Sequence, residues 1–181
     1  MKPLEKCTLV IVTLLISLAF ISCQIDRPGN HYHVPFINNS KDTIYILWMA
    51  KNDHYQSPHF HDTLLHSWDY NPLWSPEEYK SAPGEENTSA MSSDTPWEGI
   101  FHYQLDTLLI FVFNADALET FEWDFICENY LVEQRYDLSL EDLQSLDFKL
   151  YFPPTEAMKH IHMWPPYGTY DEHGGRKDKR N

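Results

Sequence analysis

The sequence predicts a mainly β fold, an antiparallel sheet or β-sandwich with one or two short helices inserted in the C-terminal half. Runs rich in β-branched and aromatic residues recur along the chain, and such runs are typical of strands. They do not alternate with helical patterns from the start, as a parallel doubly wound sheet would require. A length of 181 residues suits a single domain of ordinary size.

Two strands are expected at the start of the domain, over residues 33–38 and 43–49. The second run reads TIYILWM, and β-branched and aromatic side chains of this kind favour a strand. The residues between the runs, 38–42, read NNSKD, which is typical turn chemistry. The pattern therefore predicts that the two strands form a hairpin.

The segment from Lys51 to about Gly99 loses this periodicity, because prolines interrupt it repeatedly. Ser75 followed by Pro76 is typical of a helix start, with the serine capping and the proline in the first helical position. Residues 81–96 are small, polar and interrupted by Gly and Pro, and they predict a mobile loop.

The next strand is expected over residues 105–113. Positions 108–113 are all apolar, which indicates a central strand buried on both faces. Asn114 can cap a helix over residues 117–129. The apolar side chains of this helix lie close to helical spacing: Leu118, Phe121, Phe125 and Ile126.

Three further elements complete the expected domain. Residues 131–136 read as a strand, and Ser139 with Asp142 predicts the capped start of a brief helix that ends near Ser145. Residues 147–152 alternate as a final strand. The single mainly β domain is thus expected to cover residues 33–153.

The N-terminus predicts a signal peptide over residues 1–22. Lys2 and Lys6 precede an apolar run, and Cys23 follows it where a small-residue cleavage site is usual. The stretch LAFISC looks like the lipobox of bacterial lipoproteins, with Phe20 where leucine is commonest. That likeness implies a lipid, palmitate included, on Cys23.

Two alternatives to lipidation are an uncleaved transmembrane anchor and ordinary cleaved secretion. The uncharged stretch just reaches spanning length, although Thr and Ser dilute it. Residues 23–32 are polar and are expected to tether the lipid to the domain. Gln24 in place of aspartate favours the outer membrane, by likeness to bacterial sorting rules. We therefore expect a lipid-anchored protein of the cell envelope.

Charge and cysteine content narrow the function classes. The net charge of −14 argues against nucleic acid and against peripheral binding to an anionic membrane surface. Cys7 leaves with the signal peptide and Cys23 carries the lipid, so Cys127 has no partner for an internal disulfide. We expect Cys127 to be a small buried apolar residue.

Histidines provide the metal-binding hypothesis. His59 and His61 lie two residues apart, so in an extended segment both imidazoles face one side and can bind zinc or copper. Neighbouring residues that can add ligands are His54, Asp62 and His66. Two further pairs have the same spacing: His31 with His33, and His160 with His162. The alternative is that all these are loop histidines without a ligand role.

Aromatic residues provide the binding hypothesis. Trp48, Trp68, Trp74 and Trp97 flank or populate the irregular region, and a glycan or a peptide can stack on such rings if they share an exposed groove. The alternative is that the rings build the core. No catalytic motif is found and no cofactor is expected. We therefore favour a noncatalytic binding or accessory module, with a metal site or metal-dependent activity at His59 and His61 as the alternative.

Residues 154–181 are expected to form a tail outside the domain. This stretch is dense in Pro, His and aromatic residues and ends in a basic run, Arg176 to Arg180. The basic end can contact acidic groups of its own domain or an anionic envelope polymer, or fray as a terminus.

Several segments together resemble a known group of proteins. They are residues 38–46, 110–116, 135–143 and 151–153. The chain resembles small uncharacterised lipoproteins of Bacteroides-type bacteria over roughly residues 33–153. The resemblance implies location and the extent of the fold, and it brings no activity or site residues.

Overall fold

The computed structural model describes residues 30–51, 65, 70–103 and 105–177. The chain divides into two units, residues 1–30 and 31–181, and the description below concerns the second. Cys23, its signal peptide and the tether up to residue 29 therefore lie outside the described residues. In the described part, no helix has both the length and the apolar character needed to cross a membrane.

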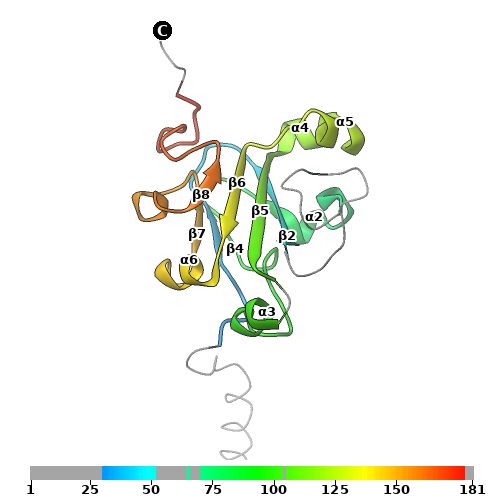
Figure 1. Cartoon of the computed structure of the whole chain (residues 1–181). Coiled ribbons are helices and arrows are strands. Elements are labelled where there is room, and N and C mark those ends of the chain that lie inside the picture. The colour runs from blue at the N-terminus through cyan, green and yellow to red at the C-terminus, as the bar shows by residue number, and fades with distance from the viewer. Residues whose placement is uncertain (1–29, 52–64, 66–69, 104, 178–181) are drawn as a thin grey trace, which may run out of the picture. The chain divides into compact units, whose positions relative to one another are not determined.

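Two sheets, dominated by antiparallel pairs, form the domain, and the predicted mainly β fold is confirmed (Figure 1). The larger sheet has the order β3-β2-β5-β6-β8 and is antiparallel throughout. Its strands are β2 (Ile44–Lys51), β3 (Lys80–Ser81), β5 (Thr107–Asn114), β6 (Gln134–Leu138) and β8 (His162–Trp164). The smaller sheet has the order β4-β1-β7, with β1 parallel to β7. Its strands are β1 (Phe36–Asn38), β4 (Glu86–Asn87) and β7 (Leu150–Phe152).

The central strand is β5, as its unbroken apolar sequence predicts. Residues 108–113 are all buried, and their side chains alternate between two cores. Leu108, Ile110 and Val112 join the core shared by the two sheets, where Phe36 of β1 also packs. Leu109, Phe111 and Phe113 face a second core on the opposite side of the larger sheet.

Short helices lie between the strands. Their bounds are η2 (Pro72–Trp74), α2 (Pro76–Tyr79), α3 (Trp97–Tyr103), α4 (Ala115–Thr120), α5 (Trp123–Glu128), α6 (Leu140–Ser145) and η3 (Glu156–Met158). The side chains of Asn114 and Ser139 cap α4 and α6 as predicted, and Asp142 completes a capping box with Ser139. Left-handed backbone at Asp147 and Phe148 follows α6, so the expected strand over 147–152 begins only at Leu150.

The single helix predicted over residues 117–129 is instead two helices. The backbone of Phe121 and Glu122 is extended, so α4 ends at Thr120 and α5 begins at Trp123. This break rotates the second helix relative to the first, and the apolar spacing read from the sequence no longer describes one buried stripe. Leu118 and Ile126 are buried, as expected for core positions.

The predicted hairpin of residues 33–38 with 43–49 is wrong. β1 pairs with β4 and β7, whereas β2 pairs with β3 and β5. The buried Asn38 explains the difference, because its amide nitrogen donates to the carbonyl groups of Asp42 (2.9 Å) and Ser81 (3.0 Å). Its side-chain oxygen accepts from both the N–H and the hydroxyl of Ser40. The turn therefore passes the chain from one sheet to the other.

The mobile loop predicted over residues 81–96 is also wrong for much of its length. It contains β4 and two core side chains, Ala90 and Met91, which are 1% and 0% exposed. Asn87 fixes this path, since its side chain donates to the carbonyl oxygens of Glu78 and Lys80 and accepts from the backbone of the next turn. Side-chain hydrogen bonds take the place of a long ladder here.

The predicted domain boundary at residue 153 is wrong, because the following segment is part of the domain. β8 pairs with β6 and forms an edge of the larger sheet. Four apolar side chains beyond the boundary enter the core shared by the sheets: Met158, Ile161, Met163 and Tyr170. The stretch read as a tail is therefore core-forming to at least residue 170.

Candidate functional site

The leading metal-binding candidates, His59 and His61, lie outside the described residues, as do His54, Asp62 and His66. The site that the sequence places there stays a prediction. Within the described part of the chain, no three His, Cys, Asp or Glu side chains are placed to share a metal ion. Cys127, expected to be a small buried residue, is 7% exposed in α5.

The other histidine pairs diverge towards different partners. Nδ1 of His31 lies 2.5 Å from Oε1 of Glu98, and its ring stacks on Phe148. His160 lies 3.7 Å from a carboxylate oxygen of Asp142, while His162 contacts a different carboxylate on β6. Each imidazole is oriented by its own neighbour, so the two-residue spacing does not create shared ligand sets in these segments.

The tryptophans do not line one exposed groove. Trp97 is 0% exposed, and its ring lies edge-on to Trp48 with centroids 5.3 Å apart. Trp74 is 69% exposed and contacts Tyr70, also edge-on, on a different part of the surface. Trp68 lies outside the described residues. For Trp97 the core-building alternative is the right one.

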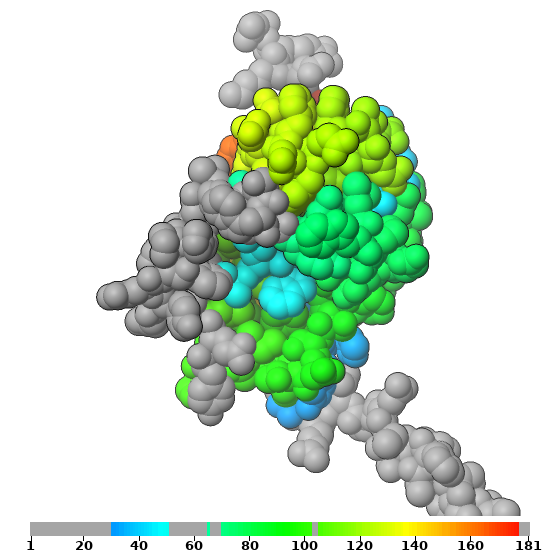
Figure 2. Space-filling view, turned by 90° about the vertical axis from the view of Figure 1, so that its right-hand side faces the viewer, coloured from blue at the N-terminus to red at the C-terminus, as the bar shows by residue number. Residues whose placement is uncertain are grey.

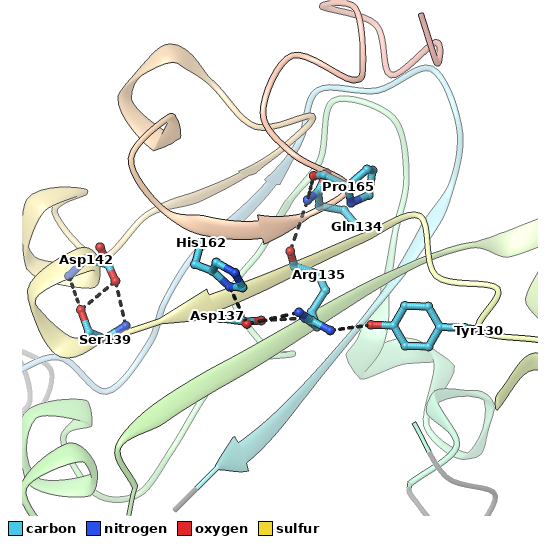
Figure 3. A network of polar contacts seen from close by, with 8 residues as sticks. All are labelled: Tyr130, Gln134, Arg135, Asp137, Ser139, Asp142, His162 and Pro165. Carbon is cyan, nitrogen blue, oxygen red and sulfur yellow. Dashed lines mark hydrogen bonds and ion pairs between the residues drawn. The ribbon is translucent and has the colours of Figure 1, made fainter. Parts of the chain in front are cut away.

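A polar network lies on the face of the larger sheet that carries the second core (Figure 3). Arg135 donates to Asp137 through Nε (2.7 Å) and Nη2 (3.3 Å), and its Nη1 donates to the hydroxyl of Tyr130 (3.0 Å). Nδ1 of His162 lies 2.7 Å from the other side of the same carboxylate. The antiparallel register places Asp137 opposite His162 and Arg135 opposite Trp164.

The network orients His162 but lacks the remaining parts of a hydrolytic site. A carboxylate on Nδ1 leaves Nε2 facing outward, as in acid–base catalysis. No hydroxyl or thiol among the described residues contacts that ring, whose side chain is 76% exposed. Arg135 and Asp137 are only 11% and 12% exposed, so their ion pair is largely buried. We therefore assign the network a structural role in holding β6.

Three cavities surround the basic residues near the C-terminus. The largest, about 680 Å³, is here named the C-terminal cavity, and two neighbours measure about 370 and 290 Å³. The C-terminal cavity is lined by Pro165, Pro166, Tyr167, Gly168, Thr169, Arg176 and Lys177. Arg176 also lines the smallest cavity and Lys177 the middle one. The volume of the C-terminal cavity lies in the usual range for small-molecule sites.

A tight hairpin holds these two cations in place. Tyr170 and Arg176 form a β-bridge, Asp171 N–H donates to Gly175 O (2.8 Å), and Lys177 N–H donates to Thr169 O (2.8 Å). The carboxylate of Asp171 accepts from backbone N–H groups within the turn, and these bonds lower its pKa. The charge of Asp171 is therefore used inside the hairpin.

The hairpin is anchored to the sheets at two points. The hydroxyl of Tyr170 donates to the carbonyl oxygen of Glu133, and burial together with that glutamate raises the pKa of Tyr170, so the donor proton is kept. Gly174 has φ +78°, and an added Cβ would lie 2.7 Å from Cβ of Ser40. Lys41 N–H also donates to His173 O (3.1 Å). The cavity wall is therefore built on the inter-sheet turn.

The electrostatics of the C-terminal cavity differ from those of the rest of the domain. Lys80, Arg135 and Lys159 each pair with a carboxylate. Among described residues, Arg176 and Lys177 have no carboxylate within ion-pair distance. They are also the only charged side chains in the lining of the C-terminal cavity, whereas carboxylates line both neighbouring cavities.

Sequence reasoning recognised the basic end but not the cavity. Arg176 and Lys177 were expected to contact an anionic polymer, contact the domain or fray, and the structure places them in the hairpin. Lys179 and Arg180 lie outside the described residues. The available signal was the order of Gly168, a DEHGG turn and then two cations, which is typical of a short hairpin.

Comparisons with protein-family models, with curated proteins and with solved structures found no match to this chain. The functional argument therefore rests on the geometry of the C-terminal cavity and on the sequence of the N-terminus.

Proposed function

We propose that the protein is a lipid-anchored module of the cell envelope that binds an anionic ligand in the C-terminal cavity without catalysing a reaction. One observation carries the proposal: the only charged side chains lining the largest cavity are cations, in a protein of net charge −14. Unpaired Arg and Lys side chains at a concave site favour carboxylate or phosphate groups. Noncatalytic binding agrees with the incomplete network around His162.

The lining favours a short acidic saccharide. Arg176 supplies a planar fork that suits a carboxylate, and Lys177 supplies a second positive charge. Tyr167 with Pro165 and Pro166 gives an apolar wall on which the C–H face of a sugar ring can pack. The strongly negative charge of the whole protein repels long polyanions, so the favoured ligand carries few charges.

The first prediction concerns binding of an acidic trisaccharide. We expect trigalacturonate to bind the full chain, purified in a nonionic detergent, and maltotriose not to bind. Arg176→Gln/Lys177→Gln should weaken trigalacturonate binding at least tenfold, because each charge-assisted contact contributes on the order of 1.5–3 kcal/mol. Isothermal titration calorimetry measures both constants, and added salt should weaken binding.

A charge-matched control separates the cavity from overall charge. Lys80→Gln/Lys149→Gln removes the same two charges from residues outside the C-terminal cavity and should leave the affinity within twofold. Equal weakening by both double variants, or equal binding of trigalacturonate and maltotriose, would contradict a site built on Arg176 and Lys177.

The second prediction concerns the anchor. We expect metabolic labelling with a palmitate analogue to mark the wild-type chain and to be lost completely in Cys23→Ala, since the thiol carries the lipid. A multiply acylated cysteine would hold the protein firmly on its membrane. Protease treatment of intact cells, compared with lysed cells, reports whether the domain faces outward from the outer membrane. Persistent label in the alanine variant would exclude Cys23 as the lipidated residue.

A further inference from the structure

Two phenylalanines stand on the surface where α4 meets α5. Phe121 and Phe125 are 45% and 44% exposed, and their rings stack with centroids 5.0 Å apart and planes inclined by 26°. Figure 2 shows this yellow-green corner next to the surface formed by residues 70–90. Two contiguous exposed aromatic rings differ from the scattered single apolar residues that any surface carries.

The outward position of the pair is fixed by buried neighbours. Ile126 and Cys127 form the inner side of α5 and are 0% and 7% exposed. Trp123 packs its edge against Phe113 of the second core, with centroids 5.8 Å apart. With these side chains turned inward, the helix can present Phe125 only to solvent, next to the extended residue Phe121. The pair is therefore a preformed surface.

Acidic residues surround the pair. Residues 115–128 contain no Lys or Arg. Their five carboxylates all belong to exposed residues: Asp116, Glu119, Glu122, Asp124 and Glu128. Glu119 is occupied by Lys80 (2.6 Å), and Glu122 and Asp124 directly flank Trp123 between the two phenylalanines. Among described residues, no cation forms an ion pair with either of these two carboxylates.

We infer that this corner, defined by Phe121, Glu122, Asp124 and Phe125, is a docking surface for a basic segment of a partner protein. An apolar side chain of the partner covers the stacked rings, and its Lys or Arg side chains reach the flanking carboxylates. A cation can also lie over a phenylalanine face. Charge decides the occupant, because a second copy of this chain or an anionic membrane would bring like charge to the same place.

This surface is separate from the C-terminal cavity, and its test does not depend on that proposal. The probe is a fluorescein-labelled peptide, KFKLKFK, with KSKSKSK and EFELEFE as analogues. Fluorescence anisotropy is recorded on the full chain in a nonionic detergent, with micelles alone as the blank. We expect KFKLKFK to bind measurably, and both analogues to bind at least tenfold more weakly.

Two variants localise the contact. Phe121→Ser/Phe125→Ser should weaken binding of KFKLKFK at least tenfold, because it removes the apolar half of the surface. Glu122→Lys/Asp124→Lys keeps both rings and should reverse the preference, so that EFELEFE binds better than KFKLKFK. This reversal remains decisive even if the serine variant does not fold.

A matched control addresses the acidity of the whole protein. Glu77→Gln/Glu86→Gln removes two exposed carboxylates outside the corner and should change binding by less than twofold. The proposal is overturned if KSKSKSK binds as tightly as KFKLKFK, or if the lysine variant shows the wild-type preference.

Discussion

A chain truncated after Pro154 is expected to lose its cooperative unfolding transition. The truncation removes β8 from the larger sheet and four buried side chains from the shared core: Met158, Ile161, Met163 and Tyr170. Burying one large apolar side chain contributes about 1.5–3 kcal/mol. Four such losses are of the order of the whole stability of a domain, about 5–15 kcal/mol. Near-ultraviolet circular dichroism during urea denaturation measures the loss.

A second truncation, after Lys177, is the control. It removes only residues outside the described part of the domain and should keep the urea midpoint of the full chain. Limited proteolysis adds an independent measurement: sites over 86–91 and 158–170 should resist cleavage, since both stretches carry core side chains. A shorter chain that unfolds at the same urea concentration as the full chain would restore the domain boundary at residue 153.

Features set by local sequence were predictable. Six consecutive apolar residues identify β5 as a central strand, because only a strand buried on both faces tolerates them. Asn114 and Ser139 cap their helices through bonds to residues three positions away, so the signal and its partner lie within one turn. The mainly β class follows from such strands.

Features set by distant partners were not predictable. Asn38 looks like a hairpin turn residue, and only its bond to the carbonyl of Ser81, far along the chain, directs β1 and β2 into different sheets. Met91 is a single apolar residue in a polar stretch, and its burial depends on β4 joining β1. Local periodicity carries no information about either pairing.

The two proposed surfaces illustrate the same limit. Arg176 and Lys177 were visible as a basic end, but the cavity they line needs Gly174 to pack against Ser40. Phe121 and Phe125 were assigned to a buried helical stripe, and they are exposed because the helix breaks between α4 and α5. Both sites arise from tertiary contacts that fix where a recognisable residue type points.

Asp137→Ala is expected to destabilise the domain by about 3 kcal/mol, the lower end of the range for breaking a buried ion pair. The variant leaves the guanidinium of Arg135 in a site where that residue is only 9% exposed, without the carboxylate that accepts two of its hydrogen bonds. The cost comes from an uncompensated buried charge rather than from lost surface contacts. Urea denaturation of the full chain in a nonionic detergent, followed by circular dichroism, measures it.

Two companion variants test that physical reason. His162→Ala removes the other partner of Asp137, but its side chain is 76% exposed, so the expected loss is below about 1 kcal/mol. Arg135→Met/Asp137→Leu removes both charges and should recover most of the stability lost in Asp137→Ala, because apolar side chains of similar volume avoid the desolvation cost. If the double variant is instead less stable than Asp137→Ala, the ion pair itself stabilises β6, and burial of an unpaired charge is not the source of the loss.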